Sequence, residues 1–377
     1  MIIYSATFVS SLVFMRVSQA FKKNREVSAF FLVIAIAIPC YLASQRDISI
    51  GADTQGYISG MYNLAVKTKS SLFHYLAIAP PWYAVPRTIV GYMSLTWVCA
   101  QFSNGFQILL FLITLLSILP VYFAIKKVSN NTNEVMLSYT LYFLFIYNIT
   151  FNAARQTIAL GFYLLAFVCM MKKQYKRTVI YSIISFSFHD TALLIVAIAI
   201  IKYLIVDKTK SSNAQKKYEC IMIVMSALAV IGFYPLLSLL IHSGIYSHGS
   251  VYLAQRRFDF SFIKTGLYLL VYIVISLNKK NMVLTKEDEF YRFISLLSVI
   301  WLQIGVFITY ADRLSWYFFF PVIHVYLPQI AYGKAGKIKK KRGVYTAIII
   351  MAFIVYWIVL YGVINEHNTV PYVFRRG

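Results

Sequence analysis

Long apolar stretches, most of them about 16–24 residues in length, recur from one end of the sequence to the other. A helix needs about 20 mostly apolar residues to cross the roughly 30 Å hydrocarbon core of a bilayer. Hydrophobic residues make up 60% of the 377-residue chain and charged residues 13%, whereas soluble domains contain about 45–50% and 25%. The sequence therefore predicts an all-α polytopic membrane protein, with residues 1–377 in a single transmembrane domain. It excludes a soluble enzyme and a secreted disulfide scaffold.

Basic residues indicate how the chain is oriented. There are 36 Lys and Arg residues against 13 Asp and Glu residues, which gives a net charge of +23. In a soluble chain this excess would suggest nucleic acid, but here the basic residues gather in short clusters between apolar stretches. Such clusters are typical of the cytoplasmic side, so we expect a membrane and no nucleic acid as partner. The clusters are Lys22 to Arg25, Lys126 and Lys127, Lys172 to Arg177, Lys202 to Lys217, Lys279 to Lys286, and Lys334 to Arg342.

These clusters predict the number of crossings, because a helix must lie between each cytoplasmic cluster and the opposite side. We expect about 12 transmembrane helices (11–13), with both ends of the chain outside. The predicted crossings are residues 2–20, 27–44, 106–125, 135–151, 156–171, two within 178–206, then 219–242, 263–278, 290–310, 314–332 and 344–364.

Two outer loops are longer than the others. Residues 45–105 form the first, and residues 243–262 form the second. Within the first, residues 86–103 are apolar, but a full crossing there would put Lys126 and Lys127 on the wrong side. We therefore expect a re-entrant or interfacial helix, since irregular backbone at membrane depth is tolerated where protein or a wet cavity lines it. The prolines Pro80, Pro81 and Pro86 fit such a broken entry.

Charged and polar residues recur at the outer ends of the predicted helices. A helix N-terminus and an arginine side chain both favour a bound phosphate, and several predicted helices place a cation at that end. The arrangement therefore predicts an anion site at the outer face. The residues concerned are Arg46, Asp53 and Tyr57; Arg155 and Gln156; His189 and Asp190; Arg256 and Arg257; and Asp312, Arg313 and Tyr317.

Each of these residues also has a simpler interpretation. An outer arginine such as Arg155 or Arg313 often extends only to lipid phosphate, and Arg46 ends an outgoing helix whose dipole it complements. Asp53 would serve as the N-cap of a short helix through Tyr57. His189 would be a hydrogen-bonded interfacial residue with Asp190 as an N-cap, and the Arg256–Arg257 pair would lie in a solvated loop.

Short motifs in a fixed order give the chain a family resemblance. The run Arg46…Gly51-Ala52-Asp53-Thr54…Tyr57 resembles the "R…G-x-D-T…Y" opening of the EpsG family of Wzy-type polysaccharide polymerases. Four later motifs resemble the family's "N-x-x-R-Q", "F-H-x-S/T", "R-x-x-x-Y" and "P-Y". They are Asn152…Arg155-Gln156, Phe188-His189 with Thr191, Arg313 with Tyr317, and Pro371-Tyr372.

The chain departs from the family pattern at two places. Ala52 stands where a threonine is common, and Pro80-Pro81-Trp82 replaces an "E-P-G" motif without its glutamate. Because of the second departure, residues 80–82 offer no carboxylate that could take part in the reaction.

The resemblance implies a GT-C-like membrane glycosyltransferase in a bacterial inner membrane. It would join undecaprenyl-pyrophosphate-linked oligosaccharide repeat units at the periplasmic face, with a chain-length regulator protein as a possible partner. We expect no cofactor and no metal, because pyrophosphate departure needs cations but not necessarily a metal, and the sequence shows no acidic metal cluster. His189 or Asp53 would be the catalytic base. From their place at the outer face we expect the pyrophosphate to be bound by Arg155, Arg313 and Arg256 or Arg257, with Arg46 as a further candidate. We also expect substrate contacts from Tyr57, Gln156, Asp190, Asp312 and Tyr317.

Two alternative functions belong to other classes. A flippase for lipid-linked oligosaccharides would also need many helices and cationic residues, but it should show two related halves and a central cavity. The sequence has no similarity between its halves, and its arginines are predicted at one face. Another polyprenyl-phosphate-dependent membrane transferase is the second alternative.

Overall fold

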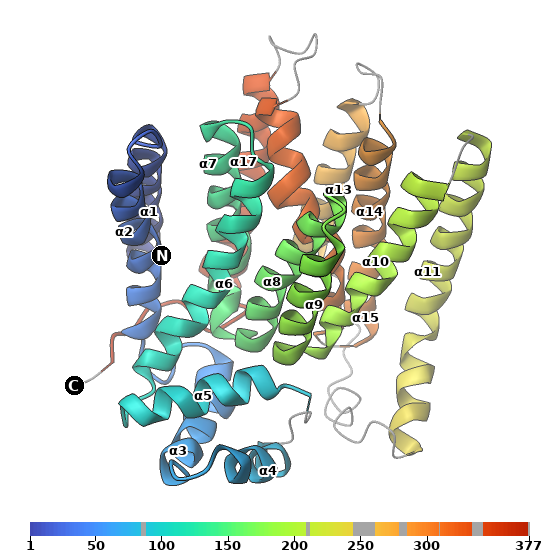
Figure 1. Cartoon of the computed structure of the whole chain (residues 1–377). Coiled ribbons are helices and arrows are strands. Elements are labelled where there is room, and N and C mark those ends of the chain that lie inside the picture. Colours follow the sequence, from blue (N-terminus) through green and yellow to red (C-terminus); the bar gives the residue numbers. More distant parts are fainter. Residues whose placement is uncertain are drawn as a thin grey trace. The chain divides into compact units, whose positions relative to one another are not determined.

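The structure is a computed structural model, and helices make up nearly all of the part that it describes (Figure 1). The described residues are 1–83, 88–208, 212–243, 261–278, 285–308, 310–333 and 342–375. Within these ranges the β-structure consists of one isolated antiparallel bridge between Arg46 and Phe374. The prediction of an all-α fold is therefore confirmed. The chain divides into two compact units, residues 1–192 with 353–377 and residues 193–352.

Unit 1 contains the long helices of the N-terminal half and the end of the chain. The pairs α1 with α2, α2 with α6, α6 with α8, and α8 with α9 pack against each other. The long helices are α1 (Ile2–Ala20), α2 (Arg25–Ser44), α6 (Gln107–Val128), α7 (Thr132–Tyr142), α8 (Ala154–Met171) and α9 (Tyr175–Phe188). Two short helical turns, η2 (Phe143–Tyr147) and η3 (Asn148–Phe151), extend α7. The final part of α17 (Arg342–Trp357) and the turn η11 (Ile358–Val363) complete the unit.

Short helices of the first outer loop lie across one end of these long helices (Figure 1). They are the π-helical turn η1 (Thr54–Ile58), α3 (Ser59–Lys67), α4 (Leu72–Tyr83) and α5 (Val90–Phe102). With only 13 residues, α5 is too short to span a hydrocarbon core. This length fits the re-entrant or interfacial helix predicted for residues 86–103, of which 86 and 87 lie outside the described residues.

Polar side chains set where several helices begin. The Asn24 side chain accepts a hydrogen bond from the backbone N–H of Val27 at the start of α2. Asn131 does the same for Glu134 at the start of α7. An asparagine at the N-cap satisfies one of the backbone donors that a helix start leaves unpaired. These caps fix the helix starts that follow basic or polar turns.

Two of the predicted basic clusters meet at one end of unit 1, beside the end of α1 that leads into a third. Lys126 donates to Gln19 of α1 over 3.2 Å. Lys127, its neighbour in α6, donates to the Cys169 sulfur of α8 over 3.3 Å, and Lys172 donates to the Lys127 carbonyl oxygen. Within this unit the basic turns therefore share one end, as the pattern of charges predicts.

Unit 2 contains the remaining helices. They are α10 (Leu194–Lys202), α11 (Ser212–His242), α13 (Phe262–Asn278), α14 (Lys286–Leu302), α15 (Ile304–Phe307) and α16 (Trp316–Pro321), with the first part of α17. Short turns accompany them at η5 (Tyr203–Lys208), η8 (Ala311–Ser315), η9 (Val322–Tyr326) and η10 (Gln329–Gly333). Along the chain, the turn η4 (Asp190–Leu193) follows α9, and unit 2 begins at its last residue.

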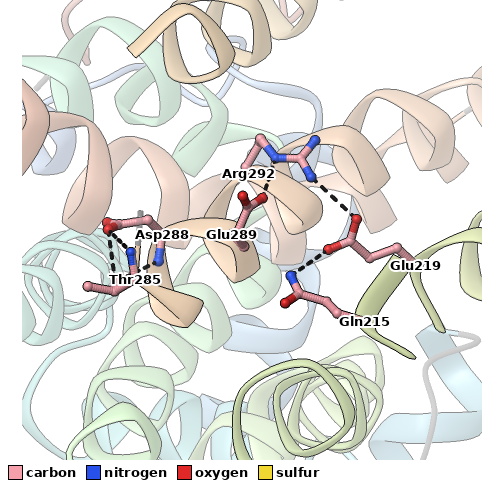
Figure 2. Close-up of polar contacts among 6 residues, drawn as sticks. All are labelled: Gln215, Glu219, Thr285, Asp288, Glu289 and Arg292. Carbon is pink, nitrogen blue, oxygen red and sulfur yellow. Dashed lines mark hydrogen bonds and ion pairs between the residues drawn. The ribbon is translucent and has the colours of Figure 1, made fainter. Parts of the chain in front are cut away.

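A polar network joins α11 to α14 within unit 2 (Figure 2). Arg292 of α14 contacts Glu219 of α11 over 3.3 Å and Glu289 over 2.8 Å. At the start of α14, the Thr285 and Asp288 side chains each accept from the other's backbone N–H. This capping box starts α14 at Lys286, the last residue of a predicted basic cluster.

Seven helical stretches in the described ranges are long and apolar enough to cross a membrane. They are Arg25–Ser44, Gln107–Val128, Thr132–Phe151, Ala154–Met171, Ala214–His242, Lys286–Phe307 and Gly343–Val363. Large apolar side chains of α11, such as Val224, Leu228 and Ile231, are exposed, which is expected for a surface that faces lipid. The protein is therefore a helical membrane protein, while the count of about twelve crossings stays a prediction.

Candidate functional site

Arg46 lies at the end of α2 with its side chain almost fully buried, at 1% exposure. Its Nε donates to the Thr54 hydroxyl over 3.1 Å, and its Nη1 donates to the Ala43 carbonyl oxygen over 3.0 Å. The guanidinium also lies 4.3 Å from the ring centre of Phe151. Burial lowers the pKa of Arg46 to about 10, so the group stays charged at neutral pH. Arg46 thereby ties α2 to the turn that follows it.

Gly51 begins that turn in a conformation that other residues rarely adopt. Its φ is +82°, and an added Cβ would lie 2.8 Å from the Phe151 Cβ and closer still to the Phe151 carbonyl oxygen. Only glycine combines this φ with so close a backbone approach. The glycine of the "G-x-D-T" run therefore lets the loop pack directly against the residues before α8.

Asp53 connects this loop to the start of α8. Its Oδ2 accepts hydrogen bonds from the backbone N–H of Ala154, over 3.1 Å, and from the Tyr57 hydroxyl, over 2.7 Å. Asp53 stands at the N-cap position of η1, but its side chain makes no capping bond there. It caps α8 instead, so the expected local N-cap of the 53–57 helix is corrected. A carboxylate at a helix N-terminus stabilises the helix by about 1 kcal/mol.

Arg155 and Tyr57 form the centre of the cluster. The Arg155 guanidinium lies 4.7 Å from the ring centre of Tyr57, a cation–π distance. Burial raises the pKa of Tyr57, Asp53 raises it further and Arg155 lowers it, so the phenol keeps its proton at neutral pH. Tyr57 sits on a π-helical turn, a local widening that is frequent at functional sites. We call Asp53, Tyr57 and Arg155 the junction cluster.

Asn152 links the junction cluster to the C-terminal part of unit 1. Its Oδ1 accepts from the backbone N–H of Ala52, and its Nδ2 donates 2.8 Å to the His367 carbonyl oxygen. The same C-terminal segment accepts from the Gly51 N–H through Asn368, over 3.3 Å. The segment around residues 367–375 therefore completes the frame that holds the loop.

His189 and Asp190 follow α9 at the same end of unit 1. Asp190 does not cap a helix as expected; its Oδ1 accepts from the Thr88 hydroxyl, just before α5, over 2.5 Å. The His189 Nδ1 lies 2.8 Å from the Thr191 hydroxyl and 3.3 Å from the Thr191 backbone nitrogen. A backbone N–H only donates, so this contact favours the tautomer with its proton on Nε2. The other ring nitrogen, Nε2, is then a hydrogen-bond donor.

Asp312 and Arg313 lie in unit 2, in the turn η8. Asp312 forms a partly buried ion pair with Lys264 at the start of α13, over 2.9 Å. The Arg313 guanidinium lies 4.5 Å from the Tyr310 ring centre and 5.8 Å from the Trp316 ring centre. Tyr310 adopts a left-handed φ of 68°, which is strained for an aromatic residue. Because η8 leads directly into α16, Arg313 stands at the start of a helical stretch, as predicted.

The remaining predicted residues differ in where they lie. Gln156 and Tyr317 are buried in the two units, at 3% and 0% exposure. Arg256 and Arg257 lie outside the described residues. The structure also shows contacts of three residues that were not predicted as site residues. Asn152 bonds to Ala52 and His367, Lys264 pairs with Asp312, and the Tyr92 ring lies beside that of Tyr57. Lys264 could have been suspected from the sequence, because it interrupts an apolar stretch near its predicted outer end.

The comparisons with known proteins give one match. The model of the EpsG family matches residues 29–374, which is nearly the whole chain. The matched range includes all three residues of the junction cluster, as well as Arg46, Asn152 and His367. No curated protein and no solved structure matches the chain.

Proposed function

The chain belongs to the EpsG family of Wzy-like polysaccharide polymerases, and from that premise we propose that it joins undecaprenyl-pyrophosphate-linked oligosaccharide repeat units. The observation that carries the proposal is the junction cluster. It brings a carboxylate, a phenol and a guanidinium together at the start of an apolar helix. This combination offers a proton acceptor next to a cation that suits a departing phosphate.

The reaction transfers the growing glycan from its lipid pyrophosphate to the incoming repeat unit. A hydroxyl oxygen of the incoming terminal sugar forms a bond to the anomeric carbon of the growing glycan. The bond from that carbon to the pyrophosphate oxygen breaks, and the pyrophosphate keeps the electron pair. Asp53 receives the proton of the attacking hydroxyl. Arg155 stabilises the negative charge that develops on the pyrophosphate.

The other candidates take supporting roles. His189 donates a hydrogen bond to an anionic oxygen, because its Nδ1 is engaged by Thr191. Arg46 holds the loop through Thr54, since its buried position suits positioning better than contact with a large substrate. Arg313, Arg256 and Arg257 remain proposed pyrophosphate ligands, without a metal ion, in a GT-C-like architecture.

The proposal is tested by deleting the gene and complementing it with the intact chain. A strain without a polymerase should carry a single repeat unit on its lipopolysaccharide, because one unit can still be built, flipped and ligated. Gel analysis of the surface polysaccharide should show the loss of the ladder and its return on complementation. Loss of every repeat unit, including the first, would instead support the flippase alternative.

We also propose that the junction cluster faces the periplasm of a bacterial inner membrane. The support is that the basic turns of unit 1 meet at the opposite end from it. Single cysteines at Gln55 and Lys23, both exposed, can be introduced into a chain whose four cysteines are replaced by alanine. An impermeant thiol reagent added to intact spheroplasts should label Gln55→Cys and leave Lys23→Cys unlabelled. The reverse pattern contradicts the proposed orientation.

A further inference from the structure

The hydroxyl of Tyr92 is a buried polar group whose hydrogen-bonding capacity is unused among the described residues. Tyr92 lies on α5 with 0% exposure, and its Oη forms no hydrogen bond with any described atom. A buried hydroxyl without a partner is costly, so proteins rarely retain one for packing alone. Phenylalanine would fill the same space without this cost. The presence of this hydroxyl therefore suggests that it binds a group from outside the described residues.

Neighbouring tyrosines of the same short helices do use their hydroxyls. Tyr62 of α3 donates to the carbonyl oxygens of Cys99 and Ser103, over 3.1 and 2.9 Å, and so caps the end of α5. Tyr57 donates to Asp53 over 2.7 Å. The unused hydroxyl of Tyr92 is thus an exception within this layer of helices.

Tyr92 lies against the junction cluster. Its ring centre is 5.9 Å from that of Tyr57, with the two rings at 71°. Tyr57, Arg155 and Asp53 all act electrostatically on the Tyr92 hydroxyl. Burial raises its pKa well above the ordinary value, so the phenol keeps its proton and donates. An O–H donor beside a guanidinium suits an anionic oxygen, which accepts from both.

The start of α5 is held firmly in place, so the position of Tyr92 is fixed. Thr88, just before the helix, donates to Asp190 beyond the end of α9. Gly91 packs against Ser187 of α9 so closely that an added Cβ would lie 3.0 Å from the Ser187 carbonyl oxygen. A donor fixed in advance loses little freedom when a ligand binds. This anchoring favours a binding role over loose packing.

We propose that the Tyr92 hydroxyl donates a hydrogen bond to a phosphate oxygen of the lipid pyrophosphate that Arg155 binds. The proposal rests on the proposed function and names one more residue of its donor site. With this role, α5 contributes a side chain that contacts the substrate and is not only a helix at the membrane interface. The sequence alone gave no sign of it, because Tyr92 is one of 30 tyrosines.

Two matched Tyr→Phe variants of the full-length protein, purified in detergent, test the proposal. Each is measured for its thermal unfolding temperature and for its affinity for undecaprenyl pyrophosphate, with undecaprenol as the uncharged probe. Tyr92→Phe should unfold at the wild-type temperature or above it, because it removes an unpaired buried group. Its affinity for undecaprenyl pyrophosphate should fall about tenfold, the effect of one hydrogen bond to a charged group. Its affinity for undecaprenol should not change.

Tyr62→Phe should behave in the opposite way. It loses the two bonds that cap α5, so its unfolding temperature should fall while its affinity for undecaprenyl pyrophosphate stays near the wild-type value. The proposal is overturned if Tyr92→Phe binds undecaprenyl pyrophosphate like the wild type, if it loses affinity equally for undecaprenol, or if it unfolds at a clearly lower temperature. A wild-type protein that does not prefer the pyrophosphate to undecaprenol overturns the proposed substrate itself, and the role of Tyr92 with it.

Discussion

Replacing Arg155 with lysine should lower the rate of repeat addition about 10²-fold, although the positive charge is kept. The arginine guanidinium is planar and donates two parallel hydrogen bonds to a phosphate, whereas the lysine ammonium is a compact point charge. The guanidinium also stacks against Tyr57 at 4.7 Å, a contact that lysine would reproduce poorly. A ladder needs many successive additions, so this loss should remove the long chains from a gel of surface polysaccharide.

Arg16→Lys provides the matched control for this experiment. Arg16 donates to Asn133 over 3.2 Å at the other end of unit 1 and is exposed, so the same substitution there should leave the ladder intact. The two variants are compared at equal amounts of inserted protein. A wild-type ladder from both would mean that Arg155 is only an interfacial anchor.

Removing the Asp53 carboxylate should have the second large effect. Asp53→Ala deletes the proposed base together with the partner of Tyr57 and of the Ala154 N–H. Loss of a general base costs about 10²–10⁴ in rate. The expected product is lipopolysaccharide with a single repeat unit and no ladder, measured by gel electrophoresis.

Asp53→Asn separates the chemical role from the structural one. Asparagine keeps an oxygen that accepts from Tyr57 and Ala154, but it takes up no proton at neutral pH. We therefore expect Asp53→Asn to be as inactive as Asp53→Ala. Asp47→Asn is the control, because Asp47 lies in the same loop and accepts from the Ser49 N–H over 3.0 Å. A near-normal ladder from Asp53→Asn would assign Asp53 to positioning alone, and the absence of even one repeat would favour a flippase.

Most helices of the fold were predictable, because apolar length is a property of the local sequence. The stretch 2–20 coincides with α1, and the predicted start of the helix that carries Arg155 lies within two residues of the start of α8. The number of crossings was harder to predict. The predicted span 135–151 continues α7 through two distorted turns, and α9 has only 14 residues, so length and composition alone do not classify every segment.

Most residues of the candidate site could be predicted from the sequence, but the contacts between them could not. The positions of Arg155 and Asp53 at helix ends could be expected from the sequence. That Asp53 caps α8 could not be, because the two partners are 101 residues apart and local capping patterns reach only a few residues. Tyr92 was missed for a related reason. Its burial depends on Thr88 and Gly91 docking α5 against α9, which no periodicity in the sequence reveals.

The segment around residues 367–375 has a consequence for how the protein is made. Its backbone pairs with the loop that carries Asp53: Val373 accepts from Asp47, and the N–H of Arg375 bonds to Gln45. His367 accepts from Asn152, which the ribosome adds 215 residues earlier. We therefore expect the loop to reach its final structure only after the last helix of the unit and this segment have been synthesised. The contacts around Asp53 would then be completed at the end of synthesis rather than during it.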